Sequence, residues 1–144
     1  MKRTYENIPE QVRAVKSEHR DQMEILRSRL DLLSGTDKVL MTMYLLNGNS
    51  FRQIARVRGV SETSVARKVH KIARRLTDGQ YIQCLRNRAK LTSGQMAIAK
   101  DFFLTGLAMS RIAVKRSLSV HLVRKALRDI QDLIDGVARR ANAS

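Results

Sequence analysis

The chain has 144 residues, of which 43% are hydrophobic, and its formal net charge is +15 at pH 7. This apolar fraction can supply a core and excludes wholesale disorder, while one proline, few aromatic residues and many Leu, Ala and Arg favour helices over strands and predict an all-α fold. A single cysteine excludes an intrachain disulfide framework, and because neither a signal peptide nor a membrane-spanning apolar run is visible, we expect a soluble, cytoplasmic protein with no membrane partner.

The positive charge is unevenly distributed along the chain. Residues 1–50 carry eight Lys or Arg against seven Asp or Glu, whereas residues 51–90 carry eleven against two and residues 91–144 carry nine against four. Because the excess begins only after a balanced N-terminal third, it favours a surface that binds a polyanion over a merely soluble basic surface. Association with the nucleoid is the corresponding expectation for localisation.

The N-terminal segment, residues 1–33, is predicted to form one amphipathic helix from about Pro9 to Leu33. Its apolar residues recur at mostly three- and four-residue steps, and His19 falls on the same face. They are Ile8, Val12, Val15, Met23, Leu26, Leu30 and Leu33. This stripe can pack on the rest of the chain or pair with a second copy, so a homodimer through this helix is one alternative.

Residues 34–76 predict a first helical unit, and the polar residues 77–80 after it indicate a linker. Within the unit, Ser50 and Ser61 are expected to cap two helices. Gly59 can take the positive φ of a tight turn between these helices. The expected helices are 37–46, 51–57 and 61–76. A second unit, residues 81–135, repeats this plan, and the tail at residues 136–144 is expected to fray. The expected helices of the second unit are 81–90, 95–104, 109–115 and 119–134.

The two units are related by an internal duplication. The segment LRSRLDLLSG at residues 26–35 returns as LRNRAKLTSG at residues 85–94, and after a one-residue slip the identities resume at an offset of 58. The identities at this offset include Ile54, Ala55, Ser61, Val65 and Ile72, which return as Ile112, Ala113, Ser119, Val123 and Ile130. Glycine, serine and arginine recur along with core residues, so each copy is a repeat of about fifty residues.

The shared positions have the spacing of a helix-turn-helix. In the first copy Ala55 lets two helices approach, Gly59 permits the turn, and Val60 and Val65 are expected to hold the two helices together. In the second copy Ser117 replaces the turn glycine. The sequence therefore predicts two tandem helix-turn-helix units of three or four helices each, preceded by the N-terminal amphipathic helix.

The segment from Leu33 to Leu76, with its LSGTDKVLMTMYLLNGNSFRQIA leader, its GVSETSV turn and its basic ARRL ending, resembles region 4 of sigma-70-type RNA polymerase sigma factors. More loosely it is similar to the LuxR-type DNA-binding domain. The second copy looks like a diverged version, with LTSGQ and RIAVKRSLSVHLV, and Arg58 and Arg116 stand where the family usually has an apolar residue. The resemblance implies a DNA-binding fold and makes RNA polymerase an alternative partner.

Helical geometry selects candidate contact residues on the helices that follow Ser61 and Ser119, because the residues opposite each buried stripe face outward. The predicted stripes are Val65, Val69, Ile72 and Leu76 in the first copy and Val123, Leu127, Ile130 and Ile134 in the second. The candidates for base contacts are Thr63, Arg67, His70, Arg74, His121, Lys125 and Arg128. The candidates for phosphate contacts are Ser50, Arg52, Lys68, Lys71, Arg75, Arg111 and Arg124.

An enzyme is not expected, and neither is a cofactor or metal. The three histidines lie far apart in the sequence without Cys or carboxylate at metal-ligand spacing, and no glycine-rich phosphate loop or nucleophile elbow occurs. The leading interpretation is a sequence-specific transcriptional regulator that binds double-stranded DNA with its two units as a covalent pseudodimer. The alternatives are a sigma-like factor in which one unit binds DNA and the other protein, and a non-specific nucleic-acid-packaging or RNA-binding protein.

Overall fold

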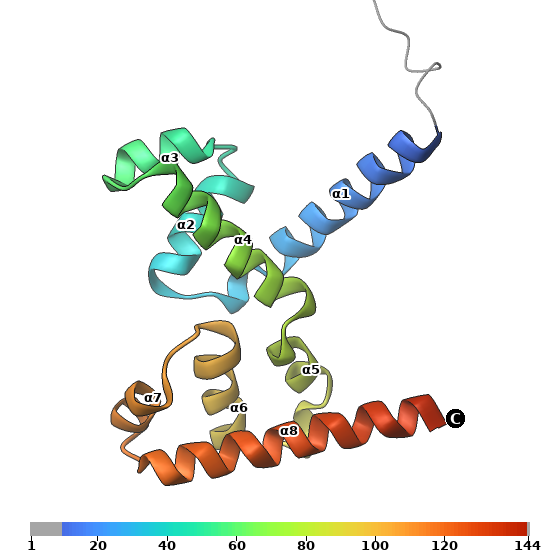
Figure 1. Ribbon diagram of the computed structural model, residues 1–144, viewed down its shortest axis with the longest axis vertical. Coiled ribbons are helices and arrows are strands. Elements are labelled where there is room, and N and C mark those ends of the chain that lie inside the picture. The colour runs from blue at the N-terminus through green and yellow to red at the C-terminus, as the bar shows by residue number, and fades with distance from the viewer. Residues whose placement is uncertain (1–9, 144) are drawn as a thin grey trace, which may run out of the picture. The chain divides into compact units, whose positions relative to one another are not determined.

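The computed structural model describes the backbone of residues 10–143 and the side chains of residues 18–142. Every regular element in this part of the chain is helical, so the predicted all-α fold is confirmed. The chain divides into two compact units, of which the first ends at Val65 and the second begins at Ala66 (Figure 1). This division lies inside one continuous helix, α4 (Glu62–Asp78), whereas the sequence placed the linker at residues 77–80.

The first unit is built around α2. Its helices are α1 (Glu10–Ser28), α2 (Gly35–Leu45), α3 (Phe51–Arg58) and the start of α4. α1 and α3 both pack against α2. The rings of Tyr44 and Phe51 stack with their centroids 5.1 Å apart, and the Nε of Arg27 donates a hydrogen bond of 3.2 Å to the carbonyl of Leu45. This bond satisfies one of the carbonyls that the end of a helix leaves without a partner, and it ties α1 to α2.

The predicted N-terminal helix ends earlier than expected. α1 stops at Ser28, and a 3-10 turn, η2 (Leu30–Leu32), follows it. Residues three apart align in such a turn, so Leu30 and Leu33 are both buried although the α-helix has ended. His19 lies seven residues before Leu26 and so on the same face of α1, as predicted, but it is exposed, and Leu26 is the only fully buried residue among the described side chains of α1. Of the residues named for this prediction, Ile8, Pro9 and the side chains of Val12 and Val15 lie outside the described part of the chain.

The second unit is assembled on α8. After α4 it contains α5 (Gln80–Arg86), α6 (Ser93–Ala99), the π-helical turn η4 (Lys100–Leu104), α7 (Met109–Arg116) and α8 (Val120–Ala143). α5, α6 and α7 each pack against α8, which runs past them as the longest helix of the described chain (Figure 1). Val123, Leu127 and Ile130 of α8 are buried, together with Ile98 of α6 and Ile112 of α7.

Two predicted helices end in turns of another kind. The segment predicted as 81–90 leaves the α-helix at Asn87 and continues as the 3-10 turn η3 (Arg88–Lys90). The side-chain amide of Asn87 donates to the carbonyl of Gln83 at 2.9 Å, the kind of local bond with which asparagine competes against a helix backbone. The segment predicted as 95–104 becomes π-helical after Ala99.

The C-terminal helix is longer than predicted. α8 continues to Ala143, so the described part of the segment expected to fray is helical. Residues 137–141 read Val, Ala, Arg, Arg and Ala, and alanine and arginine are strong helix formers, which favours continuation past Gly136. The prediction of a frayed tail was therefore wrong for residues 136–143.

The predicted linker reduces to a single residue. Thr77 and Asp78 form the end of α4, and α5 begins at Gln80, which leaves Gly79 between the helices. A Cβ atom at Gly79 would lie 2.2 Å from the carbonyl oxygen of Arg75. Only glycine allows the chain to turn so close to the preceding helix.

Candidate nucleic-acid interface

The first helix pair, α3 and α4, is joined by a short turn with one left-handed residue. Gly59 has φ 68° and ψ 33°, and the N–H of Val60 donates to the carbonyl of Ala55 at 3.1 Å. Ile54 and Ala55 are buried beside this turn. Val60 is 49% exposed, so the prediction that it helps to hold the two helices together was wrong.

The second helix pair, α7 and α8, repeats this turn with different residues. Ser117 has φ 56° and ψ 44°, and the N–H of Leu118 donates to the carbonyl of Ala113 at 2.8 Å. Among the described residues Ser117 is the only non-glycine with a positive φ. A side chain costs free energy in this conformation, so the same backbone path is formed here by a less suitable residue.

The helices that follow the two turns begin at equivalent serines. The Oγ of Ser61 accepts a hydrogen bond from the N–H of Ser64, and the Oγ of Ser119 accepts one from the N–H of Leu122, each 3.1 Å long. Both are N-cap contacts, which satisfy a backbone donor that has no partner inside the helix. The predicted cap at Ser61 is therefore confirmed, and the cap recurs in the second pair.

The first helices of the two pairs begin differently. Ser50 and Gln53 form a capping box on α3, in which each side chain accepts from the backbone of the other, at 3.1 and 2.9 Å. The predicted cap at Ser50 is confirmed. In the second pair the equivalent residue is Ala108, which offers no side-chain cap to α7.

The predicted buried stripes define the outward faces of α4 and α8. Val65, Val69, Ile72 and Leu76 are at most 3% exposed, and Val123, Leu127 and Ile130 at most 6%, whereas Ile134 is only partly buried. All seven residues predicted to contact bases are exposed: Thr63, Arg67, His70, Arg74, His121, Lys125 and Arg128. The candidate residues of α4 and those of α8 therefore lie outside the core, each group on one helix.

Most residues predicted to contact phosphates are also exposed. They are Ser50, Arg52, Lys68, Lys71, Arg111 and Arg124. Arg75 differs, because its guanidinium is partly buried and donates to the carbonyl of Leu104 at 3.4 Å. A Cβ atom added to Gly106 would lie 2.6 Å from this guanidinium, so Arg75 rests directly on the backbone there. Arg75 therefore has a structural contact within the second unit that sequence reasoning did not foresee.

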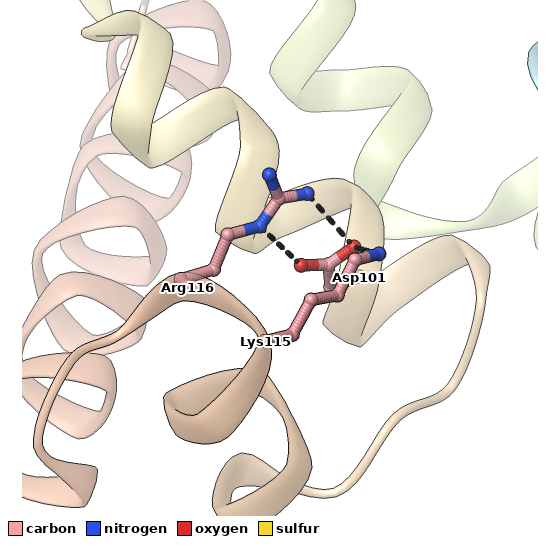
Figure 2. A network of polar contacts seen from close by, with 3 residues as sticks. All are labelled: Asp101, Lys115 and Arg116. Atoms are coloured by element: carbon pink, nitrogen blue, oxygen red, sulfur yellow. Dashed lines mark hydrogen bonds and ion pairs between the residues drawn. The ribbon is translucent and has the colours of Figure 1, made fainter.

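A buried carboxylate supports the second helix pair. Asp101, in the π-helical turn η4, is 2% exposed and accepts bonds from the last two residues of α7 (Figure 2). The Nζ of Lys115 lies 2.8 Å from its Oδ1, and the Nε of Arg116 lies 2.9 Å from its Oδ2. A second guanidinium nitrogen of Arg116 reaches Oδ1 at 3.2 Å, which makes the contact bidentate. The network anchors the end of α7 directly before the turn at Ser117.

The charge state of Asp101 follows from two opposing effects. Burial raises the pKa of its carboxyl, but the hydrogen bonds and positive charges of Arg116 and Lys115 outweigh burial and hold this pKa below its ordinary value. The same contact raises the pKa of Arg116. The carboxylate of Asp101 is therefore ionised near neutral pH, where it offsets the positive charges of Lys115 and Arg116 beside it.

Sequence reasoning missed Asp101, although a signal was present. Asp101 is the one acidic residue in the largely apolar run MAIAKDFFL of the predicted helix 95–104, and apolar segments rarely tolerate an unpaired carboxylate when they are buried. The partners lie fourteen and fifteen residues away. Arg116 was singled out only as a departure from the sigma pattern, and the network accounts for its presence.

The described residues include one cysteine and no metal-binding cluster. Within them no three His, Cys, Asp or Glu side chains gather in a way that could hold a metal ion, and no helix is both long and apolar enough to cross a membrane. Cys84 is buried, and that burial raises the pKa of its thiol, which disfavours the reactive thiolate. Cys84 is therefore a small core residue.

Apolar side chains are exposed around the turn of the second pair. Val114, Leu118, Val120 and Leu122 are 83%, 37%, 38% and 49% exposed. The corresponding residues of the first copy are Arg56, Val60, Glu62 and Ser64. The two turns thus share a backbone conformation, but the helices that follow them begin with different chemistry.

Comparison with protein-family models, with curated proteins and with solved structures finds no match to this chain.

Proposed function

We propose that this protein is a sequence-specific DNA-binding regulator of transcription that uses α4 and α8 as recognition helices. The repeated turn carries the proposal: a left-handed residue, a bond back to an alanine and a serine cap twice precede a helix with an exposed cationic face. The major groove admits one α-helix, and in helix-turn-helix proteins the second helix lies there with its N-terminal residues at the base edges.

The exposed residues of α4 divide by position into two roles. Thr63, Arg67, His70 and Arg74 lie opposite the buried stripe and reach base edges, with Arg67 suited to a bidentate contact with guanine. Ser50 and Arg52 at the start of α3, and Lys68 and Lys71 beside the outward face of α4, bind phosphates and fix the register.

The second pair contributes less affinity in this proposal. His121, Lys125 and Arg128 read bases, while Arg111 and Arg124 bind phosphates. Further along α8, Asp129, Asp132 and Asp135 stand where the first copy has Lys71, Arg74 and Thr77, and the Asp101 network offsets the charges of Lys115 and Arg116. Carboxylates near phosphates oppose binding, so α4 dominates affinity while α8 extends the contacted sequence.

A gel-shift experiment tests the proposal. Duplexes enriched from random DNA by the full-length protein are labelled and bound at about 50 and 200 mM salt, with and without excess random competitor DNA. We expect a complex that survives competition at both salt concentrations, because base contacts distinguish the enriched duplex from the competitor. A complex that random DNA removes as readily as the enriched duplex would leave only charge-driven packaging or RNA binding.

One observation favours a second candidate, a sigma-like factor whose second unit binds RNA polymerase. The later turns of α8 carry the exposed carboxylates Asp129, Asp132 and Asp135, which oppose phosphate binding, and its first turn exposes Val120 and Leu122, which a protein partner can cover. Pull-down with purified RNA polymerase, with and without DNA, distinguishes the two functions. Retention of the polymerase without DNA would support the second.

A further inference from the structure

Two exposed apolar side chains occupy the first turn of α8. Val120 is the first residue of this helix and Leu122 the third, and they are 38% and 49% exposed. They flank His121, and their neighbour Val123 is fully buried, so the helix backbone fixes where they lie. Apolar side chains that are exposed to water at the N-terminal end of a helix cost free energy unless a ligand covers them.

The first copy has hydrogen-bonding residues at these places. Glu62 and Ser64 stand where the second copy has Val120 and Leu122, and both are exposed. A glutamate at a base edge accepts from the amino group of cytosine, and a serine can donate or accept. An aliphatic side chain can do neither, so the two helices recognise different groups.

The surroundings of Val120 and Leu122 indicate what covers them. Residues 109–128 contain no Asp or Glu and six Lys or Arg. Lys115 and Arg116 are paired with Asp101, whereas Arg111, Arg124, Lys125 and Arg128 are exposed. The ligand is therefore negatively charged at its periphery and apolar where it meets the first turn of α8. The major groove of DNA fits this description, because phosphates line its edges and the 5-methyl group of thymine is the apolar group on its floor.

We infer that Val120 and Leu122 contact thymine 5-methyl groups, so that the half-site bound by α8 is read through thymine methyls while the half-site bound by α4 is read through hydrogen bonds. This inference rests on the proposed DNA binding. It makes the recognised sequence asymmetric, since a pseudodimer with two different recognition helices does not require a palindrome. Each methyl group removed from water contributes about fourfold to the dissociation constant.

Replacing thymidine by deoxyuridine tests the inference, because the substitution removes the methyl group and leaves the base-pairing groups in place. The probe is the duplex most enriched from random DNA by the full-length protein, resynthesised with one deoxyuridine at a time. We expect a loss of about fourfold in affinity at one or two positions of a single half-site, with little change elsewhere. Leu122→Ser, which installs the side chain of Ser64, removes the penalty at one of these positions, and Val120→Ser removes it at the other.

The controls separate the inference from the proposed function. Leu46→Ser changes a leucine that is 58% exposed outside both helix pairs, and it retains the full deoxyuridine penalty. Thermal unfolding followed by circular dichroism confirms that each variant is folded. If the protein binds specifically but no deoxyuridine lowers its affinity, the inference is overturned while the proposed function is kept. The same holds if both serine variants still lose affinity on deoxyuridine. In either case, Val120 and Leu122 would contact a protein partner instead of DNA. Failure to enrich any duplex overturns the proposed function itself.

Discussion

The turns of the two helix pairs follow the same backbone path with different supports. Both turns use a left-handed residue bonded back to an alanine, and both second helices start at a serine cap. The first pair has glycine at its turn and a capping box on α3, whereas the second has Ser117, no side-chain cap on α7, and the Asp101 network instead. Duplicated sequences can thus keep one geometry while the interactions that stabilise it, and the surface it presents, diverge.

The largest expected effect concerns the network that only the second copy has. Lys115→Ala combined with Arg116→Ala leaves the carboxylate of Asp101 buried without a partner, which costs about 3–5 kcal/mol of unfolding free energy. Adding Asp101→Met, the residue at position 43 of the first copy, removes the buried charge and restores most of that loss. Urea denaturation followed by circular dichroism measures all three proteins. If the double variant is as stable as the wild type, the network does not support the fold.

The pH dependence of stability provides a second measurement on this network. The pKa of Asp101 is lower in the folded chain than its ordinary value of 3.8, so its contribution is fully present above that value and is lost as the pH falls through the folded pKa. Asp101→Asn should therefore be less stable than the wild type at pH 7, and the gap should narrow in strong acid. The control Arg58→Ala changes the equivalent exposed arginine of the first copy and should alter stability by less than about 0.5 kcal/mol.

The next effect compares the two recognition helices. Arg67→Ala should cost about 1–3 kcal/mol of binding free energy on an enriched duplex, because arginine binds guanine with two hydrogen bonds. Lys125→Ala, its counterpart on α8, should cost less, since lysine acts as a point charge. Lys71→Ala should weaken enriched and random duplexes alike. Titrations on both kinds of DNA measure these changes, and equal losses for Arg67→Ala on both would exclude base readout by this residue.

A reciprocal exchange at the turns has a smaller effect. Gly59→Ser places a side chain at φ 68°, where no atom lies within 4 Å of the added Cβ, so only backbone strain of about 1–2 kcal/mol should destabilise the protein. Ser117→Gly should relieve the corresponding strain and stabilise the chain by somewhat less, because glycine loses more entropy on folding. Thermal unfolding of both variants measures the difference. Changes of the same sign would contradict the equivalence of the two turns.

The repeated local signals made much of the fold predictable. The serine caps, the glycine turn and the buried stripe of α4 each depend on residues within a few positions of one another, and all were confirmed. The identity of the second left-handed residue followed from the duplication, since Ser117 aligns with Gly59. The outward faces of α4 and α8 followed from the period of the helix alone.

Interactions between distant residues were not predictable in the same way. Asp101 meets partners on another helix, and Arg75 meets the carbonyl of Leu104, so neither contact leaves a periodic pattern in the sequence. Helix ends were also misplaced, because the end of α1 depends on a 3-10 turn and the extension of α8 depends on intrinsic propensity past a glycine. The DNA-contact residues stay predictions, since exposure on a helix is a requirement for contact and does not establish it.

The smallest expected effect concerns the starts of α3 and α7. Ser50→Ala removes the acceptor for the N–H of Gln53 and should cost about 1 kcal/mol of stability. Ala108 has nearly the same backbone conformation as Ser50, φ −66° and ψ 152° against φ −73° and ψ 160°, so Ala108→Ser can supply the missing cap. Its gain should be only about 0.5 kcal/mol, because the N–H of Arg111 already donates to the carbonyl of Ala108 at 3.0 Å. Urea denaturation of both variants measures the two effects, and a gain for Ala108→Ser as large as the loss for Ser50→Ala would indicate that this carbonyl contact contributes nothing.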